Sequence, residues 1–284
     1  MPRSPSELVK GAVTISSPPL IYQRLMEVIN HPRSGSADIA RVLSEDTGLT
    51  TRLLRIVNSA LFSFPQRIST PTHAVTIVGT AQVRDLALAT SVMTMFTGVP
   101  KELVDMESFW RHSLACGIGA RVLAGHRRED NVERFFVAGL LHDVGRLIVF
   151  MQEADAATVA MRQSREKGEF LHESELDVLG YTHAQVGGAL MHQWNFPGAF
   201  KEAVGYHHQP QRASRFPVET SAVHVADLMA NALELGSSGA HKVPELHEGA
   251  WDTLGIDPEL APIILEDVER QYMDAAQIIL GIAA

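Results

Sequence analysis

The chain has 284 residues, of which 45% are hydrophobic and only 6% aromatic, so its core must consist mainly of aliphatic side chains, a composition that favours helices. The net charge of −9 argues against nonspecific binding to a nucleic-acid backbone, although not against a local basic patch. Its single cysteine, Cys116, excludes an internal disulfide framework and any cysteine-based zinc cluster, so a metal site would need histidine and carboxylate ligands.

At this length we expect one elongated domain or two closely packed lobes. No apolar run approaches the roughly 20 residues that span a bilayer, and the first five residues lack the apolar segment of a signal peptide. We therefore predict a cytoplasmic protein that does not associate with a membrane.

Residues 1–16 are mostly polar, which predicts a disordered or extended N-terminus. Residues 17–100 hold several short amphipathic segments separated by proline, glycine and serine, a pattern typical of a compact N-terminal helical lobe. We expect its helices near residues 20–30, 37–46, 49–60, 71–78 and 82–96. No group of residues in this lobe has the pattern of a catalytic site.

Pro100 and the acidic turn after it mark the start of a second lobe, residues 101–284. We expect long helices over 101–125 and 132–151 and a charged connector at 162–169, followed by helices over 172–179, 182–194, 221–235 and 259–282. The helix over 132–151 carries His142 and Asp143 inside an otherwise apolar run. Burying a carboxylate costs several kcal/mol unless it is paired or bound to a cation, so other helices must supply partners for Asp143.

Five histidines and two aspartates on separate predicted helices are the candidate partners. They are His112, His142, Asp143, His183, His207, His208 and Asp227. Imidazole and carboxylate groups suit divalent Fe, Mn, Zn, Co or Ni, and a carboxylate can bridge two ions, so the set is enough for one or two. The same residues can instead form a hydrogen-bonded polar cluster without metal. The other eight of the 13 histidines, His172 and His224 among them, are interpreted as ordinary hydrogen-bonded side chains.

Several phrases of the N-terminal lobe stand out by their order and spacing. Among them are Ser17-Pro18-Pro19-Leu20, Glu45-Asp46-Thr47-Gly48-Leu49-Thr50, Asn58-Ser59-Ala60-Leu61-Phe62 and Arg84-Asp85-Leu86-Ala87-Leu88. Together they resemble the HDOD family, the HD-related output domain of bacterial signalling proteins. The resemblance covers residues from about 17 to about 227 and implies an all-α fold, with an N-terminal helical bundle lobe packed on an HD-superfamily helical lobe. It also implies an output or regulatory role in signal transduction, acting through signalling proteins or a small phosphorylated ligand.

The resemblance also implies roles for the histidines and aspartates. Four of them match the ligands of the first metal ion in the HD superfamily: His112, His142, Asp143 and Asp227. Three more resemble the additional ligands of the two-metal branch, which includes the HD-GYP phosphodiesterases: His183, His207 and His208. On this interpretation the Asp143 carboxylate bridges the two ions.

The chain departs from the HD-GYP pattern in four places. Arg146 stands where that pattern has lysine, and it can contact phosphate but cannot act as a proton donor. Gln209 rather than glutamate follows the histidine pair, the Gly-Tyr-Pro loop is missing, and Ser108 stands where some two-metal members carry a further carboxylate. We therefore do not expect cleavage of cyclic-di-GMP.

Two alternatives to a non-enzymatic output module stay open from the sequence. One is a metal-dependent phosphohydrolase, in which Asp143 and Arg146 would be the catalytic residues. The other is an oxygenase with a di-iron site, which the same ligands can support. The sequence leaves the oligomeric state open.

Overall fold

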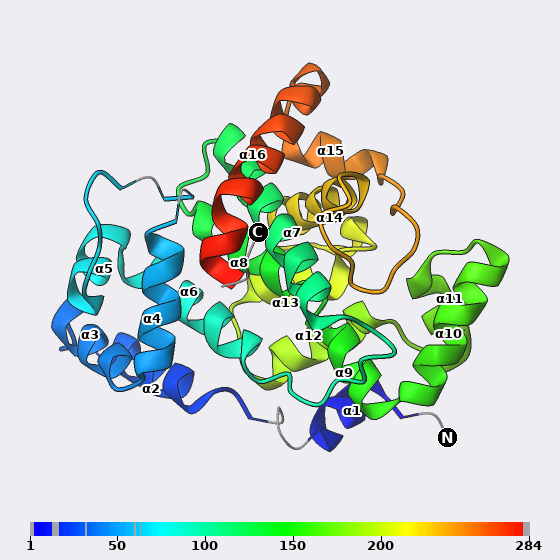
Figure 1. Ribbon diagram of the computed structural model, residues 1–284, viewed down its shortest axis with the longest axis horizontal. Coiled ribbons are helices and arrows are strands. Elements are labelled where there is room, and N and C mark those ends of the chain that lie inside the picture. The colour runs from blue at the N-terminus through cyan, green and yellow to red at the C-terminus, as the bar shows by residue number, and fades with distance from the viewer. Residues whose placement is uncertain (1–2, 13–16, 32, 60, 63, 281–284) are drawn as a thin grey trace. The chain divides into compact units, whose positions relative to one another are not determined.

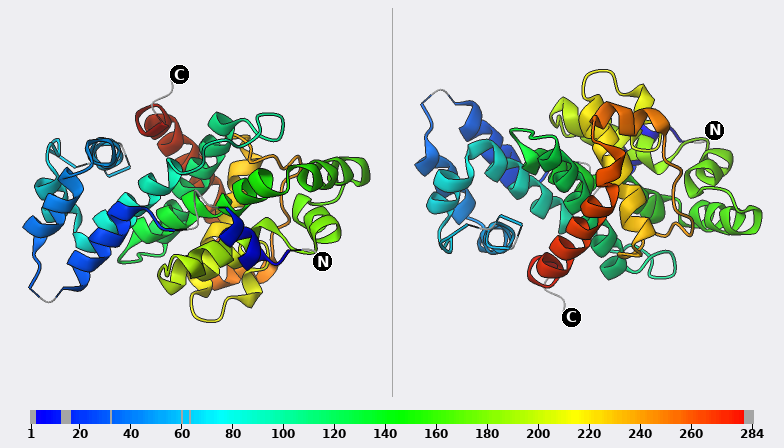
Figure 2. Two further views of the ribbon diagram at one scale, coloured as in Figure 1. Left: turned by 90° about the horizontal axis from the view of Figure 1, so that it is seen from below. Right: turned by 90° about the horizontal axis from the view of Figure 1, so that it is seen from above.

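The computed structural model describes residues 3–12, 17–31, 33–59, 61–62 and 64–280. Every regular element among them is a helix, so the all-α prediction is confirmed (Figures 1 and 2). The chain divides into two compact units, which we call the larger unit (1–17 and 96–269) and the smaller unit (18–95 and 270–284). The C-terminal residues from 270 therefore group with the N-terminal helices, whereas the sequence assigned them to the second lobe.

The smaller unit consists of short helices with aliphatic inner faces. They are α2 (Leu20–Asn30), α3 (Ser36–Ser44), α4 (Thr47–Val57), α5 (Pro71–Val78), α6 (Thr80–Met93) and the C-terminal part of α16 (Ala261–Leu280). Asp46 is the N-cap of α4, since its side chain accepts a hydrogen bond from the backbone N–H of Leu49 at 2.8 Å. Gly79, with φ of +98°, joins α5 to α6 in a conformation that other residues rarely adopt.

The larger unit holds most of the helices. They are α1 (Pro5–Gly11), α7 (Met106–His126), α8 (Val132–Leu141), α9 (Val144–Gln152), α10 (Ala154–Lys167), α11 (Leu171–Leu179), α12 (His183–Gln193), α13 (Gly198–Tyr206), α14 (Pro217–Ala232), α15 (Glu248–Leu254) and the first part of α16. Helix α7 packs against α8 and α14, and α12 packs against α9 and α13. The predicted connector at 162–169 is wrong, because α10 continues to Lys167 and ends at Gly168 in the left-handed conformation.

The prediction of a disordered or extended N-terminus is wrong for Pro5–Gly11, which form α1. Ser4 and Glu7 form a reciprocal capping box at its start. Leu8 and Val9 are fully buried in the larger unit, and this apolar pair fixes the helix against α12. The remaining residues of the predicted segment, 1–2 and 13–16, lie outside the described residues.

The predicted continuous helix over 132–151 is also wrong, because the chain breaks at His142 and Asp143 between α8 and α9. Asp143 has φ of −99° and ψ of 6°, outside the helical region. In a continuous helix, neighbouring side chains point about 100° apart, so the break allows both side chains to reach one cluster. Gly145 follows the break, and a Cβ there would lie 2.1 Å from the carbonyl oxygen of His183, so only glycine lets α9 approach α12.

The segment Val132–Gln152 is long and apolar enough to cross a membrane by length and composition alone, and no other described helix is. However, 89% of its most apolar window is buried inside the larger unit, and the break at 142–143 interrupts it. Both features are those of a core segment.

Candidate metal centre

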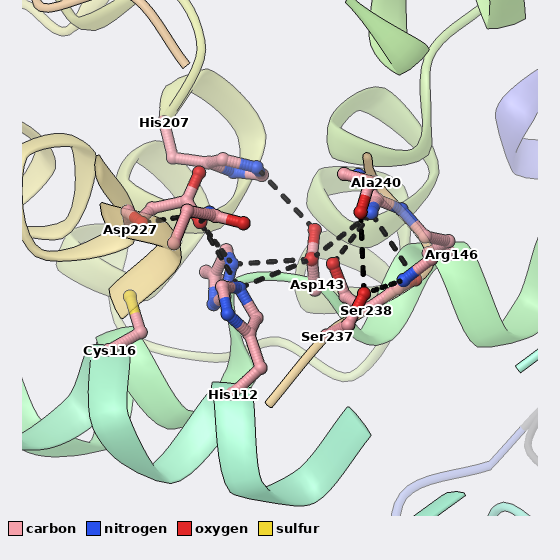
Figure 3. A network of polar contacts seen from close by, with 12 residues as sticks. His112, Cys116, Asp143, Arg146, His207, Asp227, Ser237, Ser238 and Ala240 are labelled. Carbon is pink, nitrogen blue, oxygen red and sulfur yellow. Dashed lines mark hydrogen bonds and ion pairs between the residues drawn. The ribbon is translucent and has the colours of Figure 1, made fainter. Parts of the chain in front are cut away.

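The structure brings all seven predicted site residues together inside the larger unit. Figure 3 shows His112, Asp143, His207 and Asp227 from close by. Their positions are His112 on α7, His142 and Asp143 at the α8–α9 break, His183 at the start of α12, His207 and His208 at the end of α13, and Asp227 on α14. Six of the seven are buried, and only His208 is half-buried. Ionisable groups this far from water need each other or a cation.

The histidine nitrogens and aspartate oxygens form two groups. In the first group, Nε2 of His112 lies 3.1 Å and Nε2 of His142 lies 3.7 Å from Oδ1 of Asp227. In the second group, Nε2 of His183 lies 3.3 Å from Nε2 of His207 and 3.1 Å from Nε2 of His208. Within each group the potential ligand atoms all lie within 4.8 Å of one another, so each group can hold one ion.

The Asp143 carboxylate lies between the two groups. Its Oδ2 is 3.3 Å from Nε2 of His142 and 4.0 Å from Nε2 of His112. Its Oδ1 is 2.9 Å from Nε2 of His183 and 3.7 Å from Nε2 of His207, as Figure 3 shows for the latter. Each oxygen therefore faces a different group, which is the arrangement of a bridging carboxylate.

Hydrogen bonds on the far side of the rings orient two of the histidines. Nδ1 of His142 donates to the carbonyl oxygen of Gly139 at 2.8 Å, and Nδ1 of His207 donates to that of Val204 at 2.9 Å. Because a carbonyl can only accept, each neutral ring carries its proton on Nδ1 and points the lone pair of Nε2 into the cluster. This is the tautomer that a metal ligand requires.

His183 is oriented by Glu175, a residue that the sequence analysis missed. Oε2 of Glu175 accepts hydrogen bonds from the backbone N–H of His183 at 2.8 Å and from its Nδ1 at 2.5 Å. Glu175 is only 2% exposed. The sequence held a signal for it, because Leu171, Glu175 and Leu179 are spaced four residues apart and so share the buried face of α11.

Arg146 is the only buried arginine or lysine among the described residues, and it contacts two carboxylates of this cluster. Its Nη1 lies 3.6 Å from Oδ2 of Asp143, and its Nε lies 3.8 Å from Oε1 of Glu175. Nη1 also donates to Oγ of Ser238 at 2.6 Å (Figure 3). Nη2 lies 3.2 and 3.0 Å from the two ring nitrogens of His183. These nitrogens point in different directions in the plane of the ring, so a group near both of them must lie against the face of the ring.

The carboxylates of the cluster are held in the charged form. Burial raises the pKa of Asp143, but the charges of Arg146, His142 and His183 outweigh it and hold this pKa well below its usual range. Burial likewise raises the pKa of Asp227, but the neighbouring His112 and His142 side chains outweigh it and hold this pKa well below its usual range. The cluster therefore presents two fixed negative charges to its histidines.

Two histidines of the second group are held neutral. Burial lowers the pKa of His207, and the neighbouring His142 and His183 lower it further, to well below its usual range. Burial and the neighbouring His207 have the same effect on the pKa of His208. A neutral imidazole is the form that binds metal.

The chemistry of these donors fits a divalent transition metal. Nε2 of His112, Nε2 of His142 and Oδ1 of Asp143 are buried and lack a partner in hydrogen-bond geometry among the described atoms, although opposite charges lie within about 3 Å. Leaving a buried polar atom unsatisfied costs about 1–3 kcal/mol. A cation bound by all three atoms would accept their lone pairs, so none of them would need a hydrogen-bond donor.

A small cavity lies over the cluster and adjoins a larger pocket. The cavity is lined by Asp143, Arg146, Asp227 and other residues and has about 20 Å³, room for about one water molecule. The pocket has about 510 Å³. Phe170, His172, His208 and Pro244 line both of them. The sequence analysis interpreted His172 as an ordinary side chain, but it stacks on His208 with the ring centroids 4.2 Å apart.

The fold and the site together define an all-helical protein with a buried histidine and aspartate cluster. The HDOD domain family matches residues 15–210, so the chain belongs to the HDOD family. The resemblance noted in the sequence is thereby confirmed for the family and the fold.

Two solved structures share this fold. An HDOD domain protein of unknown function from Geobacter sulfurreducens is 24% identical, with a TM-score of 0.71 over 89% of this chain and 91% of that one. A protein from Shewanella amazonensis SB2B, named "Putative phosphohydrolase", is 23% identical, with a TM-score of 0.73 over 96% of this chain and 97% of that one.

An uncharacterized protein from Treponema pallidum (strain Nichols) is 23% identical over 231 residues. These residues are 80% of this chain but only 44% of that protein. The chain thus spans less than half the length of this curated relative.

Proposed function

We propose that this HDOD protein is an output module of bacterial signal transduction whose larger unit holds up to two divalent ions of Fe, Mn, Zn, Co or Ni. The observation that carries the proposal is the position of Asp143, whose two oxygens face different groups of buried imidazoles. His112, His142 and Asp227 would hold the first ion. His183, His207 and His208 would hold the second, and Asp143 would contact both.

Charge supports an anionic partner for this centre. Asp143, Asp227 and Glu175 are buried carboxylates, and Arg146 balances only one of them, so the cluster has a charge of about −2 once its histidines are neutral ligands of an ion. One divalent ion balances this charge, and two leave an excess of about +2, which an anion would neutralise. A small phosphorylated ligand has the right charge, and we expect it to bind the fully loaded centre.

The size of the cavity supports a regulatory role for that binding. A space of about 20 Å³ over Asp143 holds one water molecule and no phosphoryl group. A ligand can therefore reach the centre only if the surrounding residues, such as Phe170 and His172, move. The ligand then binds only the conformation in which these residues have moved away, so it raises the population of that conformation. A signalling partner can distinguish it from the conformation with the cavity closed.

Metal analysis of the protein tests the proposal. Protein purified without chelator and dialysed should retain one to two transition-metal ions per chain by inductively coupled plasma mass spectrometry. Asp143→Ala should retain less than half of this amount, because it removes the group shared by both sites. Asp252→Ala, which alters an exposed aspartate on α15, is the matched control and should bind as the wild type does. A wild-type chain with less than about 0.2 ions would refute the proposal.

A metal-dependent phosphohydrolase is the second candidate function. Arg146 favours it, because its guanidinium lies 3.6 Å from Oδ2 of Asp143 and could contact the phosphoryl group of a substrate beside that carboxylate. Bound ions would supply Lewis acidity and lower the pKa of a bound water. Asp143 would orient that water, and the apolar surroundings would exclude bulk solvent.

Phosphate release separates the two candidates. Manganese-loaded protein is incubated with p-nitrophenyl phosphate, bis(p-nitrophenyl) phosphate and nucleotides, and free phosphate or nitrophenol is measured. Turnover that disappears in Asp143→Ala supports the hydrolase. Metal-loaded protein with no turnover above the Asp143→Ala background supports the output module alone.

A further inference from the structure

We propose that the two ion sites are unequal, and that the second site exchanges its ion with solvent through the ring stack of His172 and His208. In this proposal His172 is a positioning residue that keeps His208 directed at the second ion. The inference rests on the proposed metal centre and goes beyond it, since it assigns a route of exchange and a role to a residue outside the ligand set.

The proposed histidine ligands differ in how each ring is held in place. Rings of His142 and His207 are anchored at Nδ1 by backbone carbonyls, and that of His183 is anchored by Glu175. His208 has no such hydrogen bond at Nδ1 among the described contacts, and its described polar contact points inward, from Nε2 to His183. Nδ1 of His112 also lacks a partner, but that residue is completely buried on α7. His208 is therefore the least constrained ligand.

His208 is held in place by ring contact. The ring of His172 lies parallel to it, with the centroids 4.2 Å apart and the planes at 16°. On its other side His172 stacks on Phe170, at 5.7 Å and 9°. Nζ of Lys242 lies 4.1 Å from the centre of the Phe170 ring, so a cation closes the outer end of this column. The column orients His208 by ring contact in place of a hydrogen bond.

The proposed histidine ligands also differ in access from solvent. Among the five proposed histidine ligands, His208 alone is half-buried, whereas the others are 0% exposed. His172 and His208 line both the pocket of about 510 Å³ and the small cavity over Asp143. A rotation of His208 away from His172 would therefore connect the second ion directly with the pocket.

The segment 236–240 covers the first group of ligands, on the side of His112. The backbone N–H of Ser237 donates to the carbonyl oxygen and to Oγ of Ser108, at 3.1 and 2.9 Å. Arg146 holds the next residue, Ser238, at 2.6 Å, as Figure 3 shows. Gly236, with φ of +83°, packs so closely that a Cβ would lie 2.6 Å from the backbone nitrogen of His112. Opening this side would break several hydrogen bonds, whereas rotating His208 would break its ring contacts and its single described polar contact, with His183.

Metal-release kinetics test the inference on the full chain loaded with two equivalents of Zn²⁺. Excess of the chromophoric chelator 4-(2-pyridylazo)resorcinol is added, and the absorbance of its zinc complex is followed with time. The wild type should release zinc in a fast and a slow phase of equal amplitude. His208→Gln should abolish the fast phase, and Asp227→Asn should abolish the slow phase, which assigns each phase to one site.

His172 is then varied in two ways. His172→Ala removes the ring and should accelerate the fast phase about 2- to 10-fold, the range expected from one lost ring contact, while the slow phase stays within about 1.5-fold. His172→Phe keeps a stacking ring but no nitrogen, and both of its phases should match the wild type. His172 is a partly exposed residue, so neither change should prevent folding, and circular dichroism checks this.

The outcomes separate this inference from the proposed function. A wild-type chain that binds no zinc overturns both. Two phases that His172→Ala leaves unchanged, or accelerates equally, overturn the inference and leave the metal centre standing. A His172→Phe variant as fast as His172→Ala also overturns it, because the role would then belong to the nitrogen atoms and not to the stack.

Discussion

Replacing Glu175 with glutamine should weaken the second ion site selectively. In the native protein Oε2 of Glu175 accepts both hydrogen bonds from His183, and Oε1 lies 3.8 Å from Nε of Arg146. A glutamine oxygen at the position of Oε2 keeps both hydrogen bonds, but the amide nitrogen then faces the Arg146 guanidinium, so two donors meet. The substitution also removes the negative charge that makes the His183 ring a stronger ligand.

Glu175 would not touch the ion but would hydrogen-bond one of its ligands. Losing a residue of this kind reduces metal affinity about 10- to 100-fold, which corresponds to about 1.4–2.7 kcal/mol. We expect this loss at the second site only, because the described contacts of Glu175 reach His183 and Arg146 but none of His112, His142 and Asp227. The first site should change by less than about threefold.

Competition between the protein and a chelator of known zinc affinity measures both dissociation constants. Glu173→Gln is the matched control, since Glu173 lies on the same helix but is exposed, and its side chain accepts a hydrogen bond from the backbone N–H of Phe170. Equal weakening of both sites by Glu175→Gln, or no weakening of either, would refute the reasoning about His183.

Three further predictions concern the fold and the metal. Gly145→Ala should destabilise the protein by about 3 kcal/mol or more in urea unfolding, since its Cβ would lie 2.1 Å from a backbone oxygen of α12. Gly125 has open space around it, so Gly125→Ala should raise the free energy of unfolding by up to about 1 kcal/mol. Similar values for the two variants would contradict the packing of α9 on α12. Burial raises the pKa of Tyr22 to about 12 from 10 in the unfolded chain, so the native state keeps its proton longer and stability falls as pH rises from 10 to 12, by at most about 2.7 kcal/mol. Tyr22→Phe should lack this part of the loss in unfolding experiments at pH 9 and 11.5, and an equal loss in Tyr22→Phe and the wild type would contradict it. EDTA should lower the melting temperature of the wild type and leave that of Asp143→Ala unchanged, because bound metal stabilises only a native state that binds it. An unchanged melting temperature of the wild type would count against the metal centre.

The sequence was sufficient to predict the helical fold and the residues that converge, for physical reasons. Helical periodicity depends on near neighbours in the chain, and helices such as α4 and α5 were predicted within a few residues. The adjacent His142 and Asp143 in an apolar run had to find partners, and the resemblance to the HD superfamily indicated which residues these are.

Other features depend on contacts that no local pattern contains. The break between α8 and α9 stands inside a run that is apolar on both sides, so nothing near His142 marks it. The spacing of Leu171, Glu175 and Leu179 puts Glu175 on the buried face of α11, but only the structure shows that it faces His183 across the α11–α12 turn. The role of His172 depends on a ring 36 residues away, and α1 is helical because Leu8 and Val9 find a place in the larger unit.

Anomalous diffraction from crystals of the metal-loaded protein tests the central claim most directly. Data collected on either side of the absorption edge of the bound metal locate each ion. Our account predicts two anomalous peaks on opposite sides of the Asp143 carboxylate, one beside His112, His142 and Asp227 and the other beside His183, His207 and His208. A map without a peak at Asp143, from crystals grown with excess metal, would contradict it.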